Sequence, residues 1–262
     1  MLKVAALYRY PVKGFTPEPC EALTVLDAGG VAGDRVLAFR FADAPQPDNE
    51  WSPKAQGLAL INTPGLARLN LHLDTEANRL CIRLDGSTLA DDGLDADGRN
   101  RIASAVAEYV LDLDESPLAQ HPERLPLRLI GDGVTPRHQD SEAGRVTLHG
   151  RGSLAALSAA IGDPEISERR FRSNIAIEGL EAWEEQDWIG HVVRIGSVQF
   201  DVARPVVRCL ATHANPETGE RDFPVLKTLT TAFGQEHPTF AVALLARGPG
   251  EIHVGDRVEV IG

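Results

Sequence analysis

Hydrophobic residues recur along most of this chain in short runs, with the two-residue alternation of strands more often than the longer period of helices. Gly, Pro and Asp separate these runs and favour turns between strands. The expected strands cover residues 3–13, 21–26, 35–41, 79–84, 127–130, 145–149, 175–177, 240–246 and 252–261, with a meander over 191–211 that turns at Gly196-Ser197. Many short strands with few helices are typical of β-barrels rather than of a parallel sheet.

Four segments carry helical signals instead. They are residues 63–69, 101–111, 153–161 and 223–233, and in the third of them Ser153 is the expected N-cap and Gly162 the expected end. A polar segment with Pro117, Pro122 and Pro126 follows the second helix and is the expected domain boundary. The pattern therefore predicts a mainly β (α+β) fold of two β-barrel-like domains, residues 1–116 and 117–262, with a few short connecting helices.

The net charge of −12 argues against binding to nucleic acid or to an anionic membrane, because both require a basic surface. Three widely spaced cysteines form neither a disulfide framework nor a CxxC metal site, and they suit a reducing compartment. The apolar run near Met1 is too short for a signal sequence, and no window approaches the roughly 20 apolar residues of a membrane helix. We therefore expect a cytoplasmic protein without a membrane anchor.

Several common site motifs are absent from the sequence. Residues 29–34 form a glycine-rich turn without the GxGxxG spacing of a dinucleotide-binding loop. Residues 91–98 resemble part of a calcium loop, but Gly93 and Ser104 stand at the two positions where acidic ligands are needed. There is no Walker loop, no GxSxG elbow, and no HExxH or CxxC-His set for zinc. These absences direct attention to the remaining cysteine and arginine pattern.

Cys209 is the strongest candidate for chemistry. It ends an apolar, β-prone run, directly follows Arg208, and precedes a turn-rich loop, residues 212–222, which we expect to form a pocket wall. A thiol beside a fixed positive charge and an accessible loop is favoured as thiolate. His213 shares one strand face with Cys209, but two ligands do not make a zinc site.

A second pattern consists of polar residues next to turns. Lys13 precedes Gly14, Arg35 follows Gly33-Asp34, and Arg172 and Asn174 come just before a strand. Taken together, cations beside turns that expose backbone N–H groups suit an anionic phosphate ligand.

These residues belong to motifs that resemble, in order, those of the MOSC domain, the C-terminal domain of molybdenum cofactor sulfurases. The motifs are Arg170-Phe-Arg-Ser-Asn174-Ile, Trp183-Glu-Glu-Gln-Asp-Trp188-Ile-Gly190, Arg208-Cys209, Asn215-Pro-Glu-Thr-Gly219 and Gly250-Glu-Ile-His-Val-Gly255-Asp256. Upstream, Tyr10-Pro-Val-Lys13 and Gly33-Asp-Arg35 resemble the N-terminal β-barrel that accompanies this domain in the mitochondrial amidoxime-reducing components and their bacterial relatives.

The resemblance implies a molybdenum cofactor, Mo-molybdopterin, with Cys209 as both catalytic residue and thiolate ligand of the metal. It implies that Lys13, Gly14, Arg35, Arg172 and Asn174 hold the pterin and its phosphate, and that Arg208 favours the thiolate. Arg151 stands where relatives carry a Ser/Thr pair near the phosphate, and it could replace that contact. Asn215 takes the place of the usual aspartate of its loop, so a carboxylate role there is lost.

The implied activity is reduction of N-hydroxylated or N-oxygenated small molecules, such as amidoximes and N-hydroxylated base analogues. No ferredoxin-like cysteine set follows Gly255, so a separate electron-transfer protein is expected to supply the electrons. Two alternatives remain open. One is a non-catalytic carrier that holds sulfur or the molybdenum cofactor through Cys209, and the other is a binding module without a cofactor.

Overall fold

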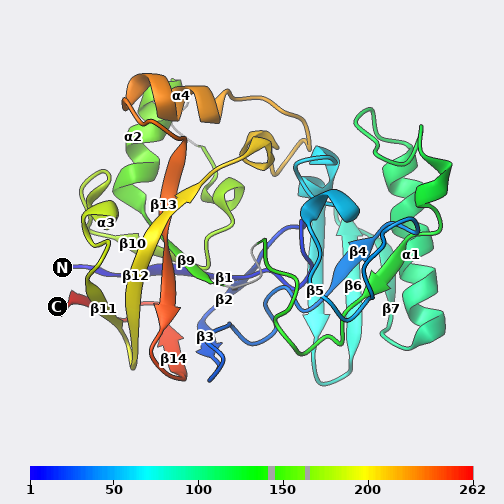
Figure 1. Cartoon of the computed structure of the whole chain (residues 1–262), viewed down its shortest axis with the longest axis horizontal. Helices are drawn as coiled ribbons and strands as arrows, with labels where there is room; N and C mark the ends of the chain where they lie inside the picture. The colour runs from blue at the N-terminus through cyan, green and yellow to red at the C-terminus, as the bar shows by residue number, and fades with distance from the viewer. Residues whose placement is uncertain (141–144, 163–165, 262) are drawn as a thin grey trace.

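The structure is a computed structural model that describes residues 1–140, 145–162 and 166–261. Eight strands form one sheet in the order β15-β11-β12-β13-β9-β10-β1-β2, on the left of Figure 1. Their bounds are β1 (Lys3–Arg9), β2 (Glu18–Cys20), β9 (Val146–Gly150), β10 (Ile175–Glu178), β11 (Val192–Ile195), β12 (Val198–Val207), β13 (Thr239–Ala246) and β15 (Val258–Val260). All neighbours are antiparallel except β9 and β10, which run parallel.

Alternation along the strands builds a hydrophobic core on one face of this sheet. In β12, Val198, Phe200 and Val202 are buried, while the residues between them point outward. A short pair, β3 (Ala22–Val25) with β14 (Gly250–His253), adds Leu23 and Ile252 to the same core. The alternation that the sequence predicts for residues 191–211 is thus confirmed as far as Val202, beyond which the register of β12 against β13 shifts.

A second layer of structure lies on the right of Figure 1. It contains the sheet β5 (Leu69–Asp74), β6 (Arg79–Leu84), β7 (Ser87–Gly93), the pair β4 (Ala38–Arg40) with β8 (Arg128–Ile130), and α1 (Ala96–Leu111). Ile102, Val106 and Val110 recur every four residues on the buried face of α1. The helix begins earlier than its apolar pattern predicts, because the Asp95 carboxylate accepts a hydrogen bond from the N–H of Gly98 at 2.9 Å.

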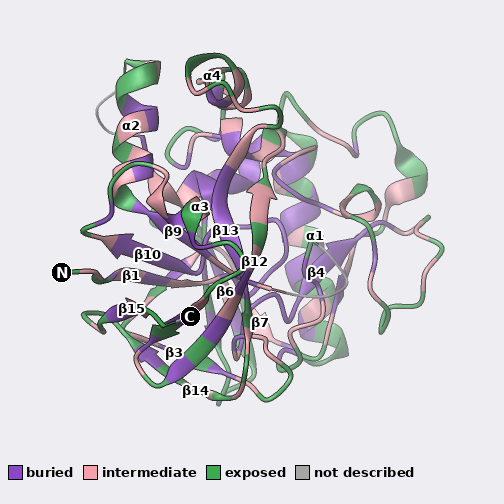
Figure 2. Cartoon of the chain, turned by 60° about the vertical axis from the view of Figure 1, so that its left-hand side comes forward, coloured by how far each residue is buried: buried purple, intermediate pink, exposed green. Residues whose placement is uncertain are grey.

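Shorter helices cover the upper part of the large sheet. They are α2 (Arg151–Ile161), α3 (Glu184–Asp187) and α4 (Val225–Ala232), and the 3-10 turns of the chain are η1 (Lys54–Gln56), η2 (Pro64–Arg68), η3 (Pro122–Arg124), η4 (Glu168–Phe171) and η5 (Leu210–His213). Leu157, Phe171, Leu229 and Phe240 pack together in this region, against the largely buried strands β9, β10 and β13 of Figure 2. None of the described helices is long and apolar enough to cross a membrane.

The start of α2 differs from the prediction, and its end agrees with it. Gly150 is the N-cap, whereas the hydroxyl of Ser153 donates to Glu185 at 2.8 Å and accepts from the N–H of Trp183. Gly162 ends the helix with a φ of 85°, in the left-handed region that favours glycine. Because the Ser153 hydroxyl bonds to Glu185 of α3, it is unavailable as an N-cap. The contact joins residues that are distant in sequence, so the local pattern does not predict it.

The predicted barrels are wrong, although the mainly β character with a few helices is confirmed. In the described ranges the large sheet runs from β15 to β2, and these two outer strands do not pair with each other. Closure requires a pairing between the first and last strands of a sheet, and short strands with Gly and Pro turns serve open sheets equally well. Strands β1 to β3 lie with strands of the C-terminal half, while the division between residues 116 and 117 stays a prediction.

Candidate functional site

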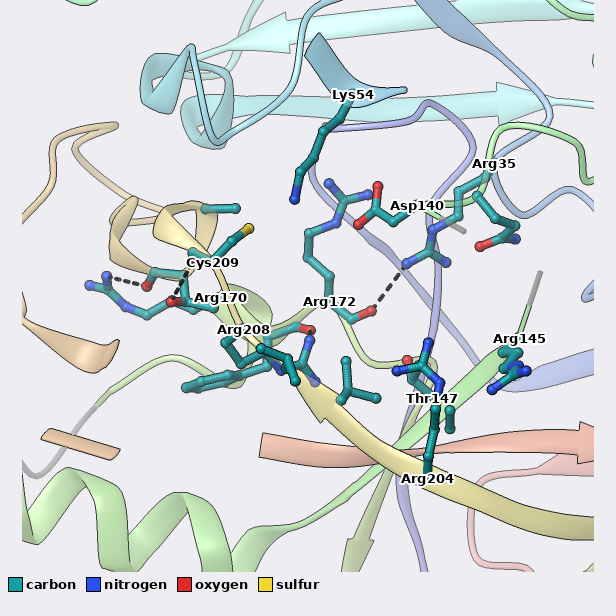
Figure 3. A pocket seen from close by; sticks show the side chains of 17 residues that line it. Arg35, Lys54, Asp140, Arg145, Thr147, Arg170, Arg172, Arg204, Arg208 and Cys209 are labelled. Carbon is teal, nitrogen blue, oxygen red and sulfur yellow. Dashed lines mark hydrogen bonds between the residues drawn. The ribbon is translucent and has the colours of Figure 1, made fainter. Parts of the chain in front are cut away.

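The thiol of Cys209 lies where β12 gives way to η5. The residue is half-buried, and its carbonyl oxygen accepts hydrogen bonds from the backbone N–H and the hydroxyl of Thr212 at 3.1 and 3.0 Å. Its side chain faces a pocket of about 230 Å³, shown in Figure 3. The pocket is lined by Arg35, Lys54, Gln139, Asp140, Arg145, Thr147, Arg170, Phe171, Arg172, Arg204, Val206, Val207, Arg208, Cys209, Ala211, Thr212 and Ala243.

The wall of this pocket is strongly cationic. Seven of the lining residues are arginine or lysine, whereas Asp140 is the one carboxylate among those described. Although desolvation acts in the opposite direction, the charges of Arg172 and Arg35 hold the pKa of Asp140 below its usual value. A chain with a net charge of −12 thus concentrates positive charge at one concave surface, which attracts an anionic ligand.

Two arginines near Cys209 have donors to spare. Arg172 follows η4 with a φ of 52°, and its Nε has no hydrogen-bond partner among the described residues. Arg208 donates from Nε and Nη1 to the carbonyl oxygens of Phe240 and Phe171 at 2.7 and 2.8 Å, while its Nη2 has no partner in the described structure. Burial lowers the pKa of Arg208 to about 10, so the group stays charged at neutral pH. Other buried arginine nitrogens without partners, such as the Nε atoms of Arg40 and Arg124, lie away from the pocket, but those of Arg172 and Arg208 line it, which points to a ligand.

Buried Asp34 holds the neighbouring part of the wall together. Its Oδ2 accepts from Nη1 of Arg35 at 2.5 Å and from Nε2 of Gln139 at 3.1 Å. Its Oδ1 accepts from the N–H of Tyr10 at 2.8 Å and from Nδ2 of Asn174 at 3.2 Å. The guanidinium of Arg35 lies over the Tyr10 ring, 4.6 Å from its centre. This carboxylate fixes the orientation of Arg35 at the pocket. It belongs to the motif Gly33-Asp34-Arg35, from which the sequence predicts only the arginine as a site residue.

Lys13 and Gly14 lie behind the wall rather than on it. The Nζ of Lys13 donates to the carbonyl oxygens of Ser52 and Gln139 at 2.9 and 3.3 Å, and burial lowers its pKa to about 8. At Gly14, φ is +81° and a Cβ would stand 2.6 Å from the Cα of Ala59, so the turn requires glycine. Lys13 therefore supports the segment that carries Gln139 and adds positive charge from behind.

Asn174 and Arg151 do not line the pocket. Asn174 is buried, and its Oδ1 accepts from the N–H of Thr147 at 3.2 Å, which links the start of β10 to β9. Arg151 begins α2 and donates to both carboxylate oxygens of Glu168 at 3.0 and 2.9 Å. Of the predicted residues, the structure brings Arg35, Arg172, Arg208 and Cys209 together on the wall, places Lys13, Gly14 and Asn174 behind it, and leaves Arg151 outside it.

Four lining cations were not predicted as site residues: Lys54, Arg145, Arg170 and Arg204. Arg204 interrupts an apolar strand, and that interruption is a usable signal; Lys54 offers none. Arg170 makes a bidentate ion pair with Asp222 at 2.8 and 2.6 Å and donates to the carbonyl oxygen of His213 at 3.1 Å. It therefore anchors the loop after Cys209 instead of offering its charge to a ligand.

The donor set fits a metal that arrives with an anionic organic ligand. In the part of the chain that the structure describes, no three His, Cys, Asp or Glu side chains gather around a possible ion. Cys209 provides one soft sulfur, which suits soft or borderline transition metals. The guanidinium groups of Arg172 and Arg208 beside it provide charge-assisted donors for an anion.

A family model described as the MOSC domain matches residues 135–259, just under half of the chain. This part of the chain is similar to MOSC domains. Within the matched range lie Arg172, Arg208 and Cys209, whereas Arg35 and Lys54 reach the pocket from residues that precede it.

Curated relatives match parts of this chain at 26% to 40% identity. The chain is 26% identical over 188 residues to mitochondrial amidoxime-reducing component 1 of Homo sapiens, which covers 65% of this chain and 55% of that protein. It is 40% identical over 65 residues to molybdenum cofactor sulfurase of Anopheles gambiae, which covers 25% of this chain and 8% of that protein. The chain therefore spans about half the length of the first relative and a small part of the second. Among solved structures, the YUAD protein from Bacillus subtilis matches 98% of this chain and 94% of its own, with a TM-score of 0.44 at 11% identity.

Proposed function

We propose that the pocket beside Cys209 binds the molybdenum cofactor and that the protein reduces N-hydroxylated small molecules, amidoximes among them. The observation that carries the proposal is the convergence of a half-buried thiol with guanidinium groups that have donors to spare. The name of one curated relative, molybdenum cofactor sulfurase, supports this cofactor, and that of another, mitochondrial amidoxime-reducing component 1, supports this class of substrate.

The residues on the wall divide the work of holding this cofactor. The thiolate of Cys209 would bind the metal, and Arg172, Arg208 and Arg35 would bind the anionic pterin and phosphate groups. When bound, the cofactor supplies a molybdenum centre for two-electron redox chemistry, which amino-acid side chains do not provide. Reduction of an amidoxime to an amidine consumes two electrons and two protons and releases water. A separate electron-transfer protein delivers the electrons.

The first prediction concerns Cys209 itself. Cys209→Ala removes the sulfur ligand, so we expect loss of amidoxime reduction, by about 100-fold or more, together with reduced molybdenum per chain. The matched control is Cys81→Ala, because Cys81 lies on β6, in the other sheet. Molybdenum is measured by elemental analysis, activity by oxidation of an artificial electron donor, and folding by circular dichroism. Undiminished activity in Cys209→Ala would refute the proposal.

A carrier of sulfur or cofactor is the second candidate, and the 40% identity to a sulfurase segment favours it. The two functions differ in turnover. A carrier binds molybdenum or holds a persulfide on Cys209 and passes it to another protein, without substrate-dependent oxidation of the donor. Stoichiometric molybdenum with no amidoxime reduction in the wild-type protein would decide for the carrier.

A further inference from the structure

A second polar group lies on the side of the pocket away from Cys209. Figure 3 shows Arg145, Thr147 and Arg204 gathered there, apart from the thiol. Thr147 lies in β9, Arg145 directly precedes that strand, and Arg204 lies in β12. These three side chains are not among those proposed to bind the metal, the pterin or its phosphate.

Strand register explains why they meet. Thr147 of β9 and Arg204 of β12 both pair with Ala243 of β13, which runs between them. Paired residues on neighbouring strands point to the same face, while the adjacent Leu148 and Val242 point into the core. Two strand spacings separate Thr147 from Arg204 by roughly 10 Å. The small Ala243 forms the floor between them, which leaves room for a ligand group.

The hydrogen-bonding capacity of this group is largely unused. The Oγ1 of Thr147 and the Nε of Arg145 are buried and have no hydrogen-bond partner among the described residues. Among the described residues, Arg204 donates only to the carbonyl oxygen of Pro205, at 3.5 Å, and neither Arg204 nor Arg145 forms an ion pair with a carboxylate. Elsewhere on the same sheet, Arg247 pairs with Asp201 at 2.7 Å.

We infer that Arg145, Thr147 and Arg204 form a subsite for an oxyanion, a phosphate or carboxylate group, at the end of the pocket opposite Cys209. Two guanidinium groups and a hydroxyl are suitable donors for such a group. Arg204 and Cys209 are five residues apart, a reach of roughly 16 Å for extended chain, so one elongated ligand or two adjoining ones fill the pocket. The subsite deepens the proposed function, because its oxyanion belongs either to the cofactor or to the substrate beside it.

The test begins with cofactor-free protein and inorganic phosphate, measured by isothermal titration calorimetry. We expect Arg204→Gln and Thr147→Val to weaken phosphate binding, the arginine change by about tenfold. The control is Arg194→Gln, which removes the same charge from neighbouring β11, where Arg194 pairs with Glu259. Thr147→Val exchanges the hydroxyl for a methyl group at nearly the same size, so in protein whose folding is verified by circular dichroism its effect reports the lost hydroxyl. Phosphate affinities equal to that of Arg194→Gln in both variants would overturn the subsite.

Loaded protein then identifies the source of the oxyanion. If the cofactor supplies it, Arg204→Gln retains less molybdenum, and benzamidoxime and 4-carboxybenzamidoxime are affected alike. If the substrate supplies it, molybdenum content is unchanged and KM rises for the carboxylated compound alone. Either result supports the subsite, and no change in molybdenum content or in either KM refutes it. Phosphate binding needs no turnover, so a failure of the proposed reductase activity in wild-type protein remains distinguishable from a failure of the subsite.

Discussion

The pocket beside Cys209 and the cluster around Glu168 both gather cations, and they differ in how far carboxylates balance the positive charge. Glu168 accepts from Arg151 at 3.0 and 2.9 Å, from the hydroxyl of Tyr8 at 2.7 Å, and lies 3.4 Å from His149. Arg172, one turn of η4 later, has no such partner in the described structure. The role of each arginine thus depends on the group that it contacts, and the order of residues in the sequence does not identify that group.

The electrostatics of the two regions differ accordingly. Burial alone would raise the pKa of Glu168, but hydrogen bonds from His149, Arg151 and Tyr8 hold it well below its usual range. In the pocket, burial and the nearby charge of Arg35 lower the pKa of Arg172. The carboxylate of Glu168 balances the positive charge of the first region. In the pocket, a bound anion would relieve the repulsion among the arginines.

The largest difference between the two regions should appear in the retention of molybdenum, when one arginine is replaced in either region. Arg172→Met deletes charge-assisted hydrogen bonds to the anion, so we expect molybdenum retention to weaken by roughly 10- to 100-fold. Arg151→Met should leave retention within about twofold, because Arg151 faces Glu168 and not the pocket. Molybdenum per folded chain, followed through dialysis, measures both. Equal losses of molybdenum in the two variants would instead show that Arg151 contacts the cofactor, as the sequence predicts.

The balanced region should matter for stability instead. Glu168→Gln keeps the size of the side chain and removes its charge, so we expect the free energy of unfolding at pH 7 to fall by about 2 kcal/mol. The folded-state pKa of Glu168 is depressed, so its contribution is present above the ordinary glutamate pKa of about 4.3 and is lost as the pH falls below it. The difference between wild type and variant in urea unfolding should therefore shrink in acid.

The control for that measurement is Glu178→Gln, since Glu178 is an exposed partner of Lys3 at 2.8 Å. Exposed ion pairs contribute little, so this variant should unfold like wild type at every pH. A pH-independent gap between wild type and Glu168→Gln would show that packing, and not the charge of Glu168, stabilises the cluster.

Much of the local structure follows from sequence because it rests on neighbouring residues. Helix α1, the end of α2 at Gly162, and the strands of the meander need only short-range patterns. The error over barrels has the opposite cause. Whether β2 meets β15 depends on pairings between segments more than 200 residues apart, and alternation is the same in open and closed sheets.

The site divides in the same way. Cys209, Arg208, Arg172 and Arg35 sit beside recognisable turns or motifs, and they do meet on one wall. Arg204 and Thr147 meet because two strands share the neighbour that carries Ala243, and this register is long-range information. The role of Asp34 escapes the sequence for another reason: besides its neighbour Arg35, it accepts hydrogen bonds from the distant Tyr10, Gln139 and Asn174, and spacing does not reveal such a role.

The smallest expected effect concerns Lys13, a cation behind the pocket that also lacks a carboxylate partner in the described ranges. Burial lowers its pKa to about 8, so its charge is present at neutral pH and disappears as the pH rises through 8. Corrected for the titration of phosphate itself, phosphate binding by the cofactor-free protein should therefore weaken about threefold between pH 7 and pH 9.

Stability should change in the opposite direction over that range, which makes the assignment to Lys13 specific. Because the folded pKa lies below the unfolded value of about 10.4, the unfolded chain binds more protons between pH 8 and 10. The cost of burying the charged amine is full below pH 8 and is relieved as the pH rises. Lys13→Met should abolish both trends, in calorimetric phosphate affinity and in urea unfolding. If the phosphate trend persists in Lys13→Met, a different group behind the wall titrates.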